Sequence, residues 1–160
     1  MYRNALLTTD GSPTAAAAFA HVAKIVEPDG TVTVVQVVDE IGRVLAKTTP
    51  AGFDLTGMSS IDSDLAEQIV ASQREDAEKH LATAKAALTA AGLKNVQTVV
   101  LEGLPGDRIV EEVVARKCDV VVMSTHGRSG FSRAMLGSVA DHVLRHLDEV
   151  PVLLVHPAAD

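Results

Sequence analysis

Aromatic side chains are almost absent from this sequence of 160 residues, which has three Phe, one Tyr and no Trp. The interior must therefore be built from aliphatic side chains, and hydrophobic residues make up 47% of the chain, a normal share for a globular protein. Aliphatic strands covered by Ala-rich helices are typical of a parallel β-sheet. The scarcity of aromatics also removes the platform on which proteins stack single-stranded bases.

Cysteine and long apolar runs are scarce as well. Cys118 is the only cysteine, so an intrachain disulfide is impossible, and this fits a reducing compartment. No run approaches the roughly 20 apolar residues of a membrane-spanning helix. The first residues lead into a strand without the apolar core of a signal peptide. We therefore expect a cytoplasmic protein with one domain over residues 1–160 and no membrane partner.

Positive charge is outnumbered, because 14 Lys and Arg stand against 21 Asp and Glu, for a net charge of −7. A general nucleic-acid-binding surface needs a basic face, so the composition argues against nucleic acid as a partner. A small anion could still bind through local backbone N–H groups.

Short apolar, β-rich runs alternate with helical patterns along the chain. Strands are expected at 3–9, 31–38, 97–101, 119–124 and 150–156, and helices at 12–25, 63–91, 107–117 and 139–147. Ser12 is a natural cap for the first helix, with Pro13 at its first position. This order predicts an α/β fold with a parallel sheet and helices on both faces.

The connections and helix faces can also be anticipated. Turns are expected at 28–30 and 103–106, and residues 39–61 are expected to form a long loop, with or without a short helix, that could act as a lid. Leu65 and Val114 are counted among the inward-facing apolar positions of their helices.

Small residues gather between the fourth strand and the last helix, in the segment 123–138. Gly127, Gly130 and Gly137 would let a ligand approach the main chain closely. A helix start offers unpaired N–H groups, which suit phosphate, so the segment predicts an anion site for the phosphates of a nucleotide. The alternative is a structural turn in which Ser138 is a plain helix cap.

Polar or small residues also follow the other predicted strands. Thr9, Asp10 and Gly11 end the first strand, Asp39 follows the second, and 103–106 follow the third. In a parallel sheet these carboxyl ends meet at one edge, where ligands bind, so the sequence predicts one shared cleft.

The chain resembles the universal stress proteins over nearly all of its length. ATP-binding members of that family carry Gly, two residues, Gly, nine residues, and then Gly followed by Ser or Thr. Here the same frame falls on Ser124, Gly127 and Gly137-Ser138, with Ser124 in place of the first glycine. Further segments resemble the strand ends of the family's nucleotide site, namely 8–10, 37–39 and 102–105.

The resemblance implies a Rossmann-like (HUP-type) sandwich with a five-stranded parallel sheet in the order 3-2-1-4-5. It implies ATP or another adenine nucleotide as the ligand, with or without Mg²⁺, and a homodimer paired through the last strand, 150–156. An edge strand that is apolar on both faces supports such pairing independently. The nucleotide-binding residues that the resemblance implies are Thr8, Thr9, Asp10, Val37, Gly103, Pro105, Met123, Ser124, His126, Gly127, Arg128, Gly137, Ser138 and Val139.

Several candidate residues in or near this predicted site also have a simpler, structural explanation. Asp10 contacts adenosine or a metal, or it is a turn residue that caps the next helix beside Ser12. Asp39 is equally open between site and turn. Arg128 and Arg133 suit phosphate but could be solvated.

The histidines and glycines do not form a recognised catalytic or metal motif. His126 has no acid fixed near it, so catalysis by this residue is not expected. His142 and His146 have the i, i+4 spacing of metal ligands, but no third ligand is evident and packing is the simpler role. No Gly-Lys-Ser/Thr follows the glycines, which excludes a Walker loop. No catalytic residue and no metal ligand is therefore predicted.

Two functions remain open at this point. The first is a nucleotide-binding regulatory module of the stress response with at most slow ATP hydrolysis. The second is a dimeric scaffold or chaperone-like protein that binds no nucleotide, an alternative that Ser124 favours. An enzyme is not expected, because fast phosphoryl transfer needs a cation clamp, positioned Mg²⁺ and a base, and only the clamp has candidates here.

Overall fold

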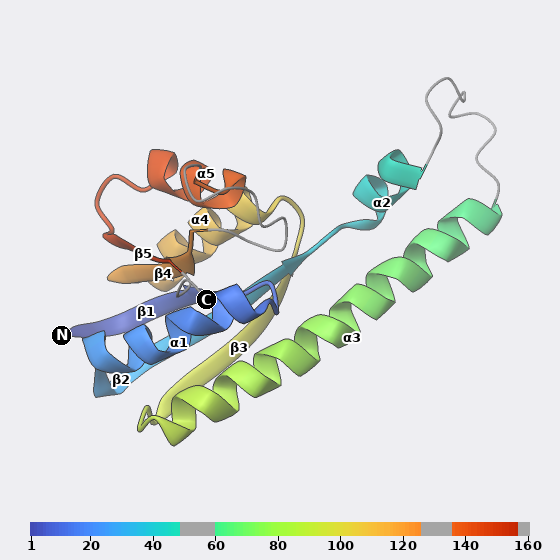
Figure 1. Ribbon diagram of the computed structural model, residues 1–160. Helices are drawn as coiled ribbons and strands as arrows, with labels where there is room; N and C mark the ends of the chain where they lie inside the picture. The colour runs from blue at the N-terminus through green and yellow to red at the C-terminus, as the bar shows by residue number, and fades with distance from the viewer. Residues whose placement is uncertain (49–59, 126–135, 157–160) are drawn as a thin grey trace.

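The computed structural model describes residues 1–48, 60–125 and 136–156. Five parallel strands form its sheet, in the order β3-β2-β1-β4-β5 (Figure 1). The strands are β1 (Tyr2–Thr8), β2 (Val26–Val38), β3 (Asn95–Glu102), β4 (Val120–Ser124) and β5 (Val152–Val155). The predicted fold class and strand order are both confirmed.

Helices cover both faces of the sheet. One face carries α1 (Pro13–Ile25) and the C-terminal half of α3 (Ser60–Ala90), and the other carries α4 (Pro105–Arg116) and α5 (Ser138–His146). The short helix α2 (Ile41–Thr48) packs on the N-terminal half of α3, and these two parts project beyond the sheet at the upper right of Figure 1. Among the described helices, none is long and apolar enough to cross a membrane.

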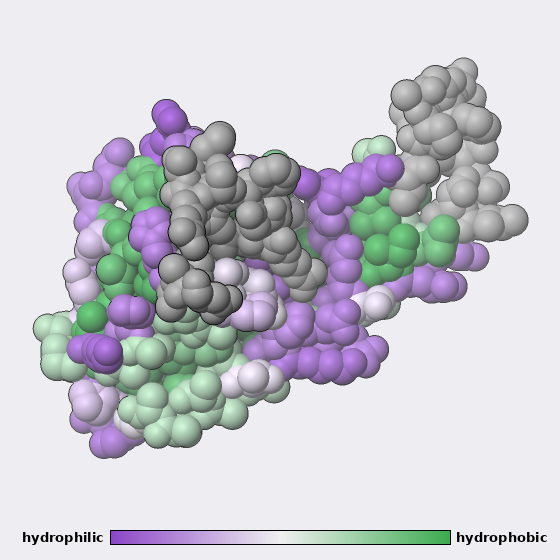
Figure 2. Space-filling model, viewed as in Figure 1, coloured by the Kyte–Doolittle hydropathy of each residue, from purple (hydrophilic) through white to green (hydrophobic). Residues whose placement is uncertain are grey.

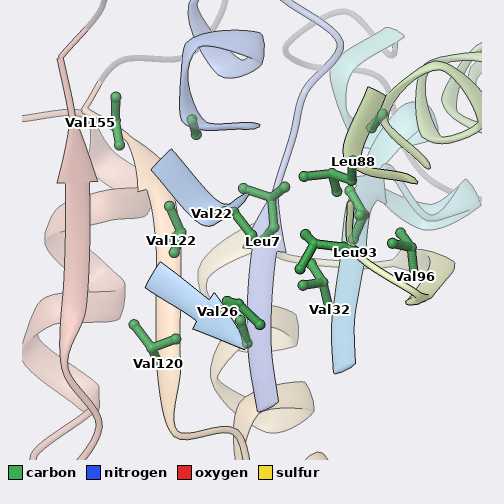
Figure 3. Close-up of a cluster of buried hydrophobic side chains, with 14 of the residues drawn as sticks. Leu7, Val22, Val26, Val32, Leu88, Leu93, Val96, Val120, Val122 and Val155 are labelled. Atoms are coloured by element: carbon green, nitrogen blue, oxygen red, sulfur yellow. The ribbon is translucent and has the colours of Figure 1, made fainter. Parts of the chain in front are cut away.

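The two faces of the sheet are buried in two aliphatic clusters. Along β1, Leu7 points into the cluster beneath α1 and α3, whereas Leu6 points into the one beneath α4 and α5. Figure 3 shows the first cluster, in which Leu7 meets side chains from α1, α3 and the neighbouring strands, among them Val22, Val32 and Leu88. Burial on both faces explains why the central strands read as continuous apolar runs.

A third, small cluster holds α2 against the projecting end of α3. Its buried members are Val44, Ala66 and Val70, with Leu45 and Ile69 packed beside them. In the space-filling view an apolar patch is visible on this projecting pair, with hydrophilic residues to its left and below it (Figure 2). The α2–α3 pair therefore has its own minor core, separate from the two that support the sheet.

Local sequence signals explain where two helices begin. Ser12 caps α1, because its Oγ accepts a hydrogen bond from the backbone N–H of Ala15 at 3.2 Å, and Pro13 takes the first helical position as predicted. Pro105 likewise opens α4. The turn predicted at 103–106 was wrong in its second half, since α4 begins two residues before the expected start.

The turn predicted at 28–30 was also wrong, because these residues lie inside β2. The pairing with β1 passes from Tyr2–Val26 to Asn4–Thr31, so β2 accommodates three extra residues as a bulge. Proline and glycine are tolerated in a strand at such a bulge. The turn-favouring residues 28–30 therefore produce a bulge within β2 and do not end the strand.

Residues 41–48 of the expected loop form α2, which bears out the short-helix option, while 49–59 lie outside the described residues together with the lid hypothesis. Leu65 and Val114 are 52% and 67% exposed, so their inward assignment was wrong. Each lies beside the buried stripe of its helix, next to Ala66 and Val113 respectively. The start of β2 lies five residues before the predicted one, and the other boundaries differ from prediction by at most three residues.

Candidate functional site

The carboxyl ends of β1, β2 and β4 surround a cavity of about 200 Å³, here called the first cavity, which α4 and α5 close from one side. Its lining residues are Thr8, Thr9, Asp10, Val35, Val37, Pro105, Ile109, Met123, Ser124, Thr125, Gly137, Ser138, Val139 and Ala140.

The first cavity has an apolar floor and a polar rim. Val35, Ile109, Met123 and Ala140 belong to the core cluster beneath α4 and α5, so the floor is part of the protein interior. Hydroxyl groups and one carboxylate, from the ends of β1 and β4 and the start of α5, form the rim. Such a cavity suits a ligand with a flat apolar part and a polar tail.

Ten of the fourteen residues predicted for a nucleotide site line the first cavity together. They are Thr8, Thr9, Asp10, Val37, Pro105, Met123, Ser124, Gly137, Ser138 and Val139. Gly103 lies next to them but lines a neighbouring cavity instead. His126, Gly127 and Arg128 lie outside the described residues, as do Gly130 and Arg133.

Sequence reasoning missed four lining residues, Val35, Ile109, Thr125 and Ala140. A signal for two of them was available. Val35 lies two residues before Val37 and thus on the same face of β2, and Ile109 follows Pro105 by one helical turn. Thr125 and Ala140 adjoin predicted residues and needed the structure to be found.

The turn after β1 is held by its own side chains. The N–H of Gly11 donates to Thr9 Oγ1 at 3.1 Å, and the N–H and Oγ–H of Ser12 donate to Asp10 Oδ1 at 2.9 and 2.5 Å. Asp10 is therefore a turn residue, but Ser12 and not Asp10 caps α1, and Asp10 also lines the cavity. The two roles are compatible, since one carboxylate has several acceptor positions.

Gly11 can be replaced by no other residue without strain. Its φ is +78°, a region that favours glycine. The ring of His80, on α3, lies directly against it, and a Cβ built on Gly11 would come within 2.1 Å of His80 Nδ1. His80 Nδ1 is in turn 3.3 Å from Oε1 of the buried Gln36. The turn that carries Asp10 is thus supported from behind by α3.

Helix α5 points its N-terminus at the first cavity. Gly137 is its capping residue, with an extended backbone, and the N–H of Gly137 donates to the carbonyl of Thr125 at 2.9 Å. Ser138 is therefore the first helical residue, so the alternative in which Ser138 is the helix cap was wrong. Helix geometry leaves the N–H groups of residues 138–140 without helical acceptors, and all three residues line the cavity. Those N–H groups and the partial positive charge of the helix end favour an anion.

A second cavity of about 360 Å³ lies beside the first, between the strand ends and the α2–α3 pair. The two cavities share Asp10, Val37 and Pro105. The remaining lining residues of the second cavity are Gln36, Val38, Asp39, Arg43, Lys47, Gln73, Asp76 and Gly103.

Asp39 is the centre of an ion-pair network in the second cavity. Its Oδ2 is 2.8 Å from Lys47 Nζ and its Oδ1 is 3.3 Å from Arg43 Nε, and its backbone N–H donates to Gln73 Oε1 at 3.1 Å. Partial burial tends to raise the pKa of Asp39, but hydrogen bonding and charge from Lys47, together with Arg43, hold that pKa below its usual value. Asp39 therefore stays ionised and holds α2 in place.

The other candidates have structural roles. His142 Nε2 is 2.8 Å from Asp107 Oδ1, and its ring stacks on that of His146 with centroids 4.1 Å apart. His142 thus joins α5 to α4. Within the described part of the chain, no group of three or more His, Cys, Asp or Glu could hold a metal ion. Cys118 is buried, and burial raises the pKa of its thiol to about 11, in agreement with an inert core cysteine.

The sequence and the fold both match known proteins. The family model for the universal stress protein family matches residues 1–156. Universal stress protein MJ0531 from Methanocaldococcus jannaschii is 32% identical over 156 residues, which cover 97% of this chain and 82% of that protein.

Solved structures share the fold at lower identity. The structure of MJ0577, from the same organism, has a TM-score of 0.79 at 24% identity and covers 100% of this chain and 99% of its own. A universal stress protein in complex with cAMP has a TM-score of 0.63 at 21% identity, with 98% of both chains covered. A family protein from Arabidopsis thaliana with AMP bound has a TM-score of 0.62 at 16% identity, covering 98% of this chain and 93% of its own.

At these identities the structural likeness establishes the fold. The match of the family model over residues 1–156, together with the relative at 32% identity, establishes the lineage. The chain therefore belongs to the universal stress protein family.

Proposed function

We propose that the first cavity binds an adenine nucleotide, and that the protein acts as a nucleotide-responsive regulatory module. The observation that carries the proposal is the convergence on one cavity of ten residues chosen from the sequence. Two structures of the same fold, one with cAMP and one with AMP, add support from relatives.

Each part of the nucleotide has a matching part of the cavity. The aliphatic floor around Val35 and Ile109 suits the base, and the backbone of Val37 can read the edge of adenine. The carboxylate of Asp10 suits a ribose hydroxyl. The N–H groups at the start of α5 suit a phosphate. Mg²⁺, where it takes part, would arrive with the phosphates of ATP and not in a cage of protein ligands.

The proposed module hydrolyses ATP slowly if at all. Among the described lining residues of the first cavity there is no Lys or Arg, and Asp10, the carboxylate there, already accepts two hydrogen bonds from Ser12. Fast phosphoryl transfer requires cations on the phosphates and a base that orients water. We expect fewer than about one turnover per minute, against about ten per second for a typical enzyme.

We further propose that two copies pair through β5. This strand ends the sheet next to β4, and its Val152, Leu153 and Leu154 are only half-buried in one chain. An open strand edge with apolar side chains is normally covered in solution. Light scattering should give the mass of a dimer, and Leu154→Lys should reduce it to that of a monomer. A monomeric parent protein would refute the pairing.

Titration calorimetry with AMP, cAMP and ATP on nucleotide-free protein tests the proposed function. We expect saturable binding, with backbone NMR shifts at Val37, Gly137 and Ser138. Asn95 and Asp119 lie at the amino ends of β3 and β4, away from the first cavity, and serve as internal controls. Their resonances should not shift. If none of the three nucleotides shifts the residues of the first cavity, the proposal is wrong and the scaffold alternative takes its place.

A further inference from the structure

The second cavity is larger than the first and has no part in the proposed nucleotide site beyond the three shared residues. Its volume of about 360 Å³ is within the range of cavities that hold small molecules. Its walls come from three strand ends and from α2 and α3, and they carry charges of both signs.

On the α2 wall of the second cavity, two positively charged side chains share one carboxylate. Arg43 and Lys47 lie four residues apart on α2, so they project from the same side of the helix. Both pair with the single carboxylate of Asp39. One carboxylate therefore faces two cations, and this leaves a net positive charge on the α2 wall.

Arg43 also carries an unused donor. Its Nε is buried and, within the described structure, has no hydrogen-bond acceptor, although Asp39 Oδ1 lies 3.3 Å away as an ion-pair partner. A buried N–H without an acceptor is unfavourable, and such a group in a native protein commonly awaits an ion, water or ligand. An oxygen-rich anionic group would satisfy both Arg43 and the excess charge.

The carboxylates of the other walls restrict which anion fits. Asp10 follows the end of β1, and Asp76 lies on α3. Asp10 accepts a hydrogen bond from Ser12, and Asp76 forms a long ion pair with Lys79 at 3.9 Å. These acids disfavour a second negative charge, as on a phosphate dianion. They favour a ligand whose other end donates hydrogen bonds, and the amides of Gln36 and Gln73 add polar contacts between the two ends.

We propose that the second cavity is a site for a small carboxylate that also carries hydrogen-bond donors, such as an amino acid or a hydroxy acid. The ligand carboxylate binds Arg43 and Lys47, and its ammonium or hydroxyl group faces Asp10 and Asp76. Without a ligand, the carboxylate of Asp39 pairs with both Arg43 and Lys47. The ligand carboxylate takes the place of Asp39 in these ion pairs.

NMR titration of the full chain without nucleotide tests this site, with L-serine, L-lactate and propionate as probes and sodium chloride as the ionic-strength control. We expect saturable shifts at Arg43, Lys47 and Gln73 with L-serine or L-lactate, and weaker binding of propionate, which lacks the donor. The two donor-bearing probes distinguish an amino-acid site from a hydroxy-acid site. Because no nucleotide is present, the outcome is independent of the first cavity.

Two substitutions should change the affinity in opposite directions. Lys47→Gln, at a side chain that is 58% exposed, should weaken binding by about tenfold through the loss of a charge-assisted hydrogen bond. Asp39→Asn should tighten binding several-fold, because it removes the competing carboxylate. Lys85→Gln, at an exposed residue of α3 outside the cavity lining, is the matched control and should leave the affinity unchanged.

Circular dichroism and a melting curve on each variant establish that α2 is retained. The proposal is overturned if no probe gives saturable shifts at the second cavity. It is overturned equally if a folded Asp39→Asn variant binds the probes more weakly than the parent, since Asp39 would then be a ligand-binding group and not a competitor.

Discussion

The first cavity is walled by the hydrophobic core of the sheet, whereas the second is walled by charged side chains on α2, α3 and the strand ends. Val35, Ile109, Met123 and Ala140 make the floor of the first cavity and are held by the packing of α4 and α5. The second cavity depends on the ion pairs of Asp39 and on the three-residue core of the α2–α3 pair.

This difference predicts how each cavity responds to conditions. Close packing is insensitive to salt and pH, so the shape of the first cavity should persist wherever the fold persists. Ion pairs between partly exposed groups weaken with salt and with protonation of the carboxylate. The shared wall of Asp10, Val37 and Pro105 is the place where a change in one cavity can reach the other.

The largest effect should come from Gly11→Ala, which distorts the turn that carries Asp10 of the shared wall. The substitution forces a side chain onto a φ of +78° and into the ring of His80, so we expect a loss of roughly 2–4 kcal/mol in the free energy of unfolding. Urea denaturation measures this loss. Gly42→Ala is the control: nothing lies within 4 Å of the added Cβ in α2, and stability should rise by up to about 1 kcal/mol. Equal effects at both glycines would contradict the support that we assign to His80.

A change confined to the first cavity comes next. Ser138→Asp places a negative charge at the start of α5, which should stabilise the helix by about 0.3–1 kcal/mol. The same charge competes with phosphate, so nucleotide affinity should fall by about tenfold, while Ser138→Ala should leave it nearly unchanged. Calorimetry and thermal melting together measure the two effects. An unchanged affinity in the Asp variant would place the phosphates elsewhere.

The smallest effect should appear in the second cavity on acidification. The pKa of Asp39 is lower in the folded protein than its ordinary value of 3.8, so its ion pairs stabilise the fold fully above that pH. This stabilisation is lost as pH falls through the lowered pKa, and for partly exposed pairs it amounts to under about 1 kcal/mol. Hydrogen exchange between pH 7 and pH 3 should show α2 opening before β1 and β4. The Asp39→Asn variant should lack this pH dependence, and its persistence there would point to another group.

The sequence predicted the parts of the fold that follow from local chemistry. The cap at Ser12, the β-branched run at 31–38 and the alternation of strands and helices were sufficient for the fold class. The first cavity followed because residues at the carboxyl ends of parallel strands converge. Family resemblance, and not local chemistry, provided the strand order.

Features that depend on distant contacts could not be predicted in the same way. The second cavity exists because Asp39 meets Gln73, 34 residues away, and because α2 folds against α3. The bulge at 28–30 depends on pairing with β1, since the same Pro28-Asp29-Gly30 segment would make a turn in isolation. Leu65 and Val114 were misassigned because an apolar residue beside a buried stripe fits the helical pattern almost as well as one within it.

The buried thiol of Cys118 can serve as a probe of local unfolding. With a pKa near 11, only about one thiol in ten thousand is ionised at pH 7, so oxidants and alkylating reagents meet an almost unreactive group in the closed protein. Reaction with such a reagent must therefore wait until the junction between α4 and β4 opens. The modification rate of this sulfur thus reports local unfolding at that junction, without any added probe.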